Sequence, residues 1–232
     1  MSASPIAAMF DRISPKYDAL NHLLSFNIDK VWRKKTAKAI SKFYPKTILD
    51  LATGTADLAI ALAKRNPQAH IIGIDISKKM LEIGKTKVAK RHLEDQIELC
   101  YGDATTLPFE DNTFDIVTVA FGVRNFEDLD KGLSEIRRVL KPNGLAFILE
   151  FSMPEKFPIK QVYRLYFKHI LPKIGRWVSK DANAYSYLPE SVERFPKPSD
   201  FLITLSNNCL IEGSVRHLGW GIATLYWAIK GR

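Results

Sequence analysis

Apolar runs and helical periodicities alternate through the middle of the chain. Runs of four to eight mostly apolar residues bounded by turn residues are typical of buried strands, and the segments between them repeat apolar residues at helical spacing. The runs that predict strands are 47–51, 70–75, 97–100, 114–121 and 145–151. The helices are predicted at 57–65, from the capping residue Ser77 through Ile83, and at 128–140. This alternation favours a doubly wound α/β fold with a mostly parallel sheet.

The segments on either side of this block have patterns of their own. They predict a basic helix at 27–43 capped by Asn27, a helix at 158–171, a helix from 199, and strands at 211–217 and 222–229. In the helix predicted at 158–171, Lys160, Arg164 and Lys168 stand four residues apart and therefore share one face, against apolar residues.

Charge is distributed unevenly along the chain. Residues 1–46 and 151–232 each carry a net charge of +6, whereas residues 47–150 carry −3. Basic flanks favour an anionic partner, either a membrane surface or nucleic acid, and a solubilising surface is the alternative. No apolar run approaches the roughly 20 residues of a membrane-spanning helix. Cys100 and Cys209 fit no zinc or CxxC spacing, which favours reduced thiols and a cytoplasmic location.

Small residues and acids follow the predicted strands of the central block. The turn after the first strand contains Gly54, which lets the backbone approach a ligand above the carboxyl edge of the sheet. Asp75 ends the second strand, where a carboxylate can accept hydrogen bonds from two ribose hydroxyls. Asp103 follows the third strand and is expected beside an adenine ring. This ordered set predicts a site for an adenosyl cofactor.

The same turn distinguishes between two kinds of adenosyl cofactor. A dinucleotide requires a GxGxxG turn, so that its pyrophosphate can rest on a helix N-terminus. Only Gly54 is present here, and Asp57 would repel a pyrophosphate. S-adenosylmethionine has no phosphate, and Asp50 and Asp57 suit its sulfonium and amino charges. We therefore expect S-adenosylmethionine, with a helix cap or a solvated turn as the alternative for each acid taken singly.

Several further segments form a specific combination. They are YDALN at 17–21, Leu24-Ser25, Trp32, FGVRN at 121–125, RVLKPNG at 138–144, EFS at 150–152 and YLPES at 187–191. On these residues the chain resembles the ubiquinone/menaquinone biosynthesis C-methyltransferase family from about Phe10 to near the C-terminus. Three positions depart from the family's pattern: Leu20 replaces a methionine, Asp29 a histidine and Asn143 a glycine.

The resemblance implies the class I S-adenosylmethionine-dependent methyltransferase fold, with a seven-stranded sheet, N-terminal helices and a helical insertion after the fifth strand. It implies cofactor contacts at Thr55, Asp75, Asp103 and Ala104. It also implies a prenylated quinol substrate, such as demethylmenaquinol, that is methylated on a ring carbon. The benzoquinol step of ubiquinone biosynthesis, the prenyl length and the oligomeric state, including a homodimer, stay open.

A chain of 232 residues suits a single domain of this kind. We expect four parts within it. They are an N-terminal helical cap (1–46), a cofactor-binding core (47–151), a helical insertion for substrate or membrane (152–198), and a C-terminal helix with strands (199–232).

Methylation of a quinol ring carbon requires a phenolate-like oxygen beside the nucleophilic carbon. Arg124 follows the strand at 114–121 and stays protonated, so we expect it to hold the developing phenolate. The resemblance points to the same pair, Arg124 and Asn125. Asp57 is the candidate acceptor of the phenolic proton, directly or through water. The alternatives are an ion pair for Arg124, a helix cap for Asn125 and a cofactor contact for Asp57.

Other functions would require sequence features that differ from those of this chain. An enzyme that methylates nucleic-acid bases usually carries an Asn/Asp-Pro-Pro-aromatic loop after the fourth strand, where this chain has FGVRN. The turn argues against an NAD-dependent oxidoreductase, and a non-catalytic quinone-binding partner remains an alternative. We expect no nucleic-acid partner and, because no His, Cys and carboxylate cluster has ligand spacing, no metal. The basic flanks, and the 158–171 helix above all, predict peripheral attachment to the anionic inner face of the membrane.

Overall fold

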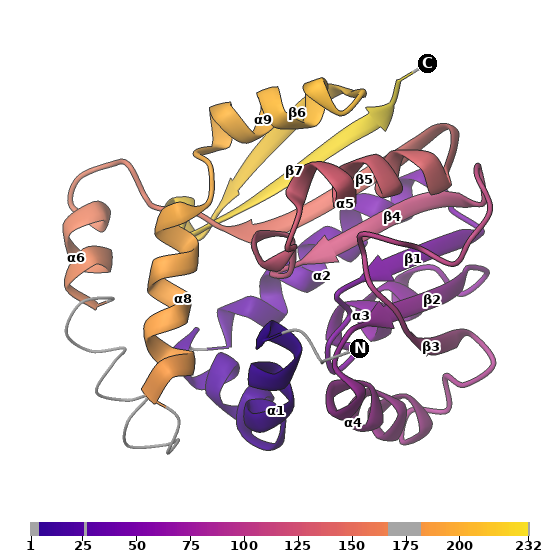
Figure 1. The fold of residues 1–232 in the computed structure, drawn as a ribbon, viewed down its shortest axis with the longest axis horizontal. Coiled ribbons are helices and arrows are strands. Elements are labelled where there is room, and N and C mark those ends of the chain that lie inside the picture. Colours follow the sequence, from indigo (N-terminus) through magenta and orange to yellow (C-terminus); the bar gives the residue numbers. More distant parts are fainter. Residues whose placement is uncertain (1–4, 26, 167–181, 232) are drawn as a thin grey trace.

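The computed structural model describes residues 5–25, 27–166 and 182–231. They form a seven-stranded sheet with the strand order β3-β2-β1-β4-β5-β7-β6 (Figure 1). The strands are β1 (Thr47–Leu51), β2 (His70–Asp75), β3 (Ile97–Tyr101), β4 (Phe114–Ala120), β5 (Leu140–Phe151), β6 (Leu210–Leu218) and β7 (Ala223–Lys230). Neighbouring strands from β1 to β5 are parallel, whereas β7 is antiparallel to both β5 and β6. The predicted doubly wound, mostly parallel sheet is confirmed.

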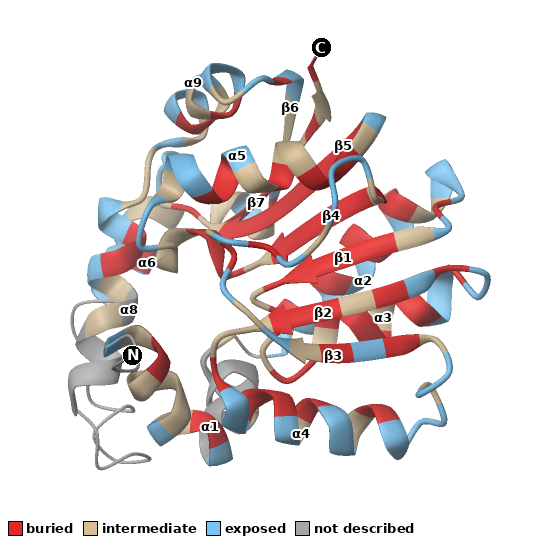
Figure 2. Ribbon diagram, turned by 45° about the vertical axis from the view of Figure 1, so that its right-hand side comes forward, coloured by how far each residue is buried: buried red, intermediate tan, exposed pale blue. Residues whose placement is uncertain are grey.

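Helices cover both faces of the sheet. The described helices are α1 (Pro5–Leu24), α2 (Ile28–Ile40), α3 (Asp57–Arg65), α4 (Lys78–Ala89), α5 (Leu129–Val139), α6 (Ile159–Leu165), α8 (Ala182–Arg194) and α9 (Pro198–Asn207), with short 3-10 turns η1 (Ser41–Phe43), η2 (Val123–Asn125) and η4 (Gly219–Gly221). One apolar cluster joins α2 and α3 to the sheet, and a second joins α5 and α9 to it. The buried central strands in Figure 2 lie between these two layers.

The remaining helices gather at one edge of the sheet. In Figure 1, α6 and α8 stand beyond the carboxyl ends of β4 and β5, and α1 lies near the same edge against α4. Carboxyl ends of parallel strands carry ligand sites in open α/β sheets. The elements predicted as an N-terminal cap and a helical insertion therefore surround the edge where the cofactor is expected.

Some predicted boundaries need correction. β5 begins at Leu140 rather than at residue 145, because Leu140 is fully buried and pairs with Phe114 before a register shift in the strand. Asn27 occupies the position before α2, but its backbone is left-handed (φ 60°) and its side chain caps nothing, so the predicted cap is wrong. Ser77 does cap α4, because its hydroxyl accepts the N–H of Met80 at 3.2 Å.

The helix predicted at 158–171 is seen only in part. Its described portion is α6, and Lys168 lies outside the described residues. No helix in the described part of the chain has the length and apolar character needed to cross a bilayer.

Candidate active site

The turn after β1 has an unusual backbone. Ala52, Gly54 and Ala56 all adopt positive φ angles, of 50°, 56° and 64°. Such angles are costly for alanine and cluster at functional sites, where the surrounding structure holds them. A Cβ added to Gly54 would meet no atom within 4 Å, so the backbone there borders open space. The turn therefore exposes its main chain to a ligand, as its small residues predict.

Asp75 joins this turn to the start of α4. Its Oδ2 accepts the N–H of Gly54 at 2.8 Å, and its Oδ1 accepts the N–H of Ser77 at 2.8 Å. Burial raises the pKa of Asp75 to about 6, against the effect of these backbone donors. Each carboxylate oxygen has more than one acceptor site, so Asp75 can also receive ribose hydroxyls.

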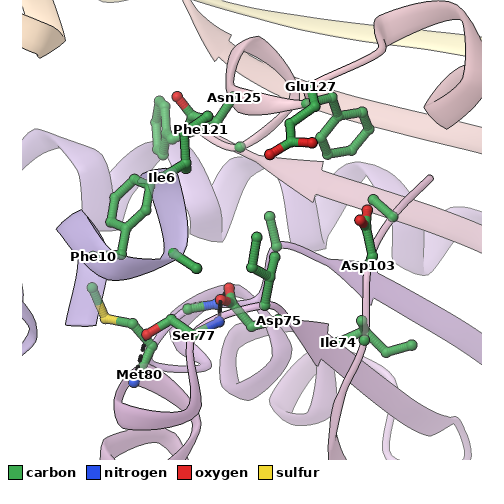
Figure 3. A pocket seen from close by; sticks show the side chains of 18 of the residues that line it. Ile6, Phe10, Ile74, Asp75, Ser77, Met80, Asp103, Phe121, Asn125 and Glu127 are labelled. Carbon is green, nitrogen blue, oxygen red and sulfur yellow. Dashed lines mark hydrogen bonds between the residues drawn. The ribbon is translucent and has the colours of Figure 1, made fainter. Parts of the chain in front are cut away.

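A pocket opens at this edge of the sheet (Figure 3). The space between its lining atoms, including the open solvent at its mouth, is about 780 Å³. It is lined by Ile6, Ala7, Phe10, Ala52, Gly54, Ile74, Asp75, Ile76, Ser77, Met80, Gly102, Asp103, Ala104, Ala120, Phe121, Gly122, Asn125, Phe126 and Glu127. Three of these residues are carboxylates and none is a cation, a lining that suits the sulfonium and amino charges of S-adenosylmethionine.

Four of the residues predicted to bind the cofactor come together here. Gly54, Asp75, Asp103 and Ala104 all line the pocket. Asp50 does not: it is 1% exposed and accepts the hydroxyls of Thr53 and Thr118, both at 2.7 Å. Burial raises the pKa of Asp50 to about 6. Its contacts tie the turn to β4, so any effect of Asp50 on the cofactor is exerted through the turn.

Thr55 and Asp57 also lie outside the pocket lining. The hydroxyl of Thr55 donates to Asp18 of α1 at 2.6 Å and accepts from Lys87 of α4 at 2.9 Å. The Lys87 ammonium also pairs with Asp18 at 2.9 Å and with Asp57. This cluster fastens α1 and α4 to the start of α3. A direct cofactor contact for Thr55 and a proton-accepting role for Asp57 stay predictions.

The Arg124–Asn125 pair lies in η2, directly after β4. The Arg124 guanidinium donates to Glu150 at 2.7 Å and to the carbonyl of Phe121 at 2.6 Å. Its side chain is 6% exposed, and that of Glu150 is fully buried. Burial raises the pKa of Glu150, and the charge of Arg124 opposes that shift. The ion-pair alternative for Arg124 is thus realised, and its catalytic role stays a prediction.

Asn125 is the member of the pair that lines the pocket, beside Phe121 in Figure 3. Its Oδ1 accepts the hydroxyl of Tyr187 at 2.8 Å. The helix-cap alternative for Asn125 is wrong, because Asp128 caps α5 by accepting the N–H of Lys131 at 2.9 Å.

The sequence did not single out several lining residues. Ile6 and Phe10 come from α1, and Phe126 and Glu127 follow η2. The apolar residues of α1 repeat at helical spacing, which signals a buried face but not which surface covers it. Among the described residues, no group of three His, Cys, Asp or Glu side chains could hold a metal ion.

Solved structures of other proteins share this fold. A SAM-dependent methyltransferase from Aquifex aeolicus superposes with a TM-score of 0.62 at 19% identity, covering 84% of this chain and 89% of that one. The [4+2]-cyclase SpnF superposes with a TM-score of 0.66 at 15% identity, covering 99% and 96%. At such identities the likeness shows the fold alone, and the two named activities differ.

Other proteins share a much higher sequence identity with this chain. The demethylmenaquinone methyltransferase of Bacteroides fragilis is 46% identical over 225 residues, which cover 97% of this chain and 92% of that protein. The ubiquinone/menaquinone biosynthesis C-methyltransferase UbiE of Geobacter sulfurreducens is 42% identical over 227 residues, which cover 97% and 88%. The profile of one family matches residues 2–230, nearly the whole chain. The chain thus belongs to the ubiE/COQ5 methyltransferase family, and S-adenosylmethionine is its cofactor.

Proposed function

We propose that this enzyme methylates a ring carbon of a prenylated quinol, with demethylmenaquinol as its substrate. The observation that carries the proposal is the place of Asn125, which belongs to the family-like FGVRN segment and lines the same pocket as Asp75 and Asp103. The names of the relatives from Bacteroides fragilis and Geobacter sulfurreducens support the same substrate class.

The bound cofactor supplies an electrophilic methyl group on a sulfonium. Asp75 would hold its ribose, while Asp103 and Ala104 would border its adenine, since all three line one pocket. Asp50 and Thr55 would support the cofactor through the turn. Phe10 and Phe121 give the lining an apolar part, and a site with little water favours a step in which opposite charges neutralise one another.

Methyl transfer further requires a phenolate next to the attacking ring carbon. We assign the stabilisation of that oxygen to Asn125, because its side chain borders the pocket. Arg124 would hold η2 in place through Glu150, acting as a positioning residue. A proton-accepting role for Asp57 would require a water between it and the substrate, because Asp57 lies outside the pocket lining and pairs with Lys87.

Incubation of the purified chain with S-adenosylmethionine and demethylmenaquinol tests the proposal. Mass spectrometry should detect a quinone that has gained one methyl group, and NMR should place this group on the ring carbon. Asp75→Asn is the control that weakens cofactor binding, and a prenylated benzoquinol measures ring selectivity. If the quinol stays unmethylated although the protein binds S-adenosylmethionine, the proposed methylation is refuted, and a non-catalytic quinone-binding role is favoured.

We propose that residues 1–232 form one domain. Because a membrane-soluble substrate requires access to the bilayer, we also propose that this domain docks peripherally on the cytoplasmic face of the membrane. The support comes from α6. Its Tyr163 is buried against α8, whereas Val162 and Leu165 are 64% and 61% exposed, and Phe157, which precedes the helix, is 81% exposed. Exposed apolar side chains beside basic residues are the composition of an interfacial helix. A homodimer remains a prediction.

Charge reversal tests the docking. Each basic residue near an anionic surface contributes roughly 1 kcal/mol, so Lys160→Glu/Arg164→Glu should weaken sedimentation with anionic vesicles about tenfold or more. The matched control reverses Lys64 and Arg65, which are exposed at the end of α3 on the opposite edge of the sheet. Equal losses in both double variants, or equal binding to neutral vesicles, would contradict docking through α6.

A further inference from the structure

Helix α8 contacts both members of the Arg124–Asn125 pair. The hydroxyl of Tyr187 donates to Asn125 Oδ1 at 2.8 Å, and Arg124 Nε donates to the hydroxyl of Ser191 at 3.2 Å. Tyr187 and Ser191 stand four residues apart and therefore lie on one face of α8. A single helix face thus fixes two neighbouring side chains at the end of β4.

The Tyr187 contact also decides which end of the Asn125 amide is available. A carboxamide offers an oxygen that accepts and a nitrogen that carries two donors. The oxygen is occupied by the Tyr187 hydroxyl, and within the described residues the nitrogen has no hydrogen-bond partner. Burial raises the pKa of Tyr187, so its hydroxyl keeps the proton that it donates.

The orientation of the amide matters because the two ends have opposite effects on an anion. An N–H group aimed at a phenolate oxygen stabilises it, whereas a carbonyl oxygen in the same place repels it. An unrestrained asparagine can present either end, because rotating its terminal torsion exchanges nitrogen and oxygen. A hydrogen bond that engages only the oxygen removes this ambiguity.

We infer that Tyr187 is a positioning residue that turns the Asn125 amide so that its N–H groups face the substrate oxygen. The inference rests on the proposed function and extends it, because it makes a helix of the 152–198 insertion part of the machinery that stabilises the phenolate. Tyr187 itself does not contact the reacting atoms in this scheme. Its effect passes entirely through Asn125.

The first test is independent of catalysis. The side-chain amide resonances of Asn125, identified by their loss in Asn125→Asp, are compared by ¹H–¹⁵N NMR in the parent and in Tyr187→Phe. Phenylalanine keeps the ring and removes the hydroxyl, so these resonances should shift. Tyr44→Phe is the matched control, because Tyr44 is 87% exposed and outside the pocket. Unchanged Asn125 resonances in Tyr187→Phe would overturn the pairing.

The second test follows turnover of demethylmenaquinol against pH. In Tyr187→Phe the Asn125 amide is no longer held, so its N–H groups no longer donate reliably to the phenolate. The pH at which kcat falls on the acid side should therefore rise by about one unit. Below that pH kcat should fall about tenfold, and the KM for S-adenosylmethionine should stay constant. Tyr44→Phe should match the parent throughout.

Each outcome has a distinct meaning. An unmoved acid limb in an active Tyr187→Phe enzyme would refute the positioning role even if the NMR shift is seen. A parallel loss of kcat at every pH with a raised cofactor KM would also refute it, because it would indicate general damage to the fold. If the parent does not methylate the quinol, the proposed function fails, and the NMR comparison alone decides the contact.

Discussion

The buried ion pair of Arg124 and Glu150 makes a predictable contribution to the free energy of unfolding. Both side chains are almost inaccessible, at 6% and 0% exposure, and the guanidinium reaches the carboxylate at 2.7 Å. Arg124→Met would leave the Glu150 carboxylate without its countercharge in an apolar environment. Such an uncompensated charge is expensive because water cannot reach it.

The magnitude follows from that burial. Removal of one partner of a buried ion pair costs about 3–5 kcal/mol. For a domain of 150–250 residues, each kcal/mol lowers Tm by about 2–4 °C, so Arg124→Met should lower Tm by about 6–20 °C. Arg124→Met/Glu150→Gln removes both charges and should recover most of the loss, since the buried carboxylate is then gone.

The loss should also depend on pH, with a definite sign. Burial raises the pKa of Glu150 in the folded protein, and without Arg124 nothing opposes this shift as strongly. Between the ordinary pKa of a glutamate and the raised one, the folded variant binds more protons than the unfolded variant. Its free energy of unfolding therefore falls as pH rises. The difference from the parent should be larger at pH 8 than at pH 5.5.

Chemical denaturation at the two pH values measures these differences, with Lys141→Met as the control. Lys141 pairs with Asp115 at 2.7 Å, but the two side chains are 39% and 30% exposed, so water screens the pair. That variant should lose no more than about 1 kcal/mol. A loss below 1 kcal/mol in Arg124→Met, or no recovery in the double variant, would refute this account of the pair.

Three further predictions concern the cofactor pocket. Asp75→Asn should weaken S-adenosylmethionine binding about 10- to 150-fold in calorimetric titration. This range corresponds to the loss of about 1.5–3 kcal/mol for hydrogen bonds to a charged group. An unchanged affinity would overturn the assignment of Asp75 to the cofactor site. The pKa of Asp75 is raised to about 6, and ribose hydroxyls favour its ionised form. The affinity of the parent for S-adenosylmethionine should therefore fall as pH drops below 6, by up to about tenfold per pH unit. The affinity of Asp75→Asn should not show this pH dependence. NADH should show no binding by the same titration, since the turn lacks the glycines that a pyrophosphate requires, and measurable affinity would contradict the argument from Gly54 and Asp57.

The sequence by itself determined the central architecture. The strands β1, β2 and β4 and helix α3 fall within one residue of their predicted bounds, because periodicity and turn residues act locally. It also determined the cofactor edge, since parallel strands carry Gly54, Asp75 and Asp103 to one side of the sheet wherever the rest of the chain lies. All three line the pocket.

Only the tertiary structure decided the partners of the charged and polar groups. Glu150 and Ser191 are 26 and 67 residues from Arg124 along the chain, and no local pattern distinguishes an arginine that faces a substrate from one that faces a buried glutamate. Asp18 likewise reaches Thr55 across 37 residues and fastens α1 beside the pocket. Such contacts depend on how separate elements pack, because a buried polar group takes whichever partner the fold brings within hydrogen-bond distance.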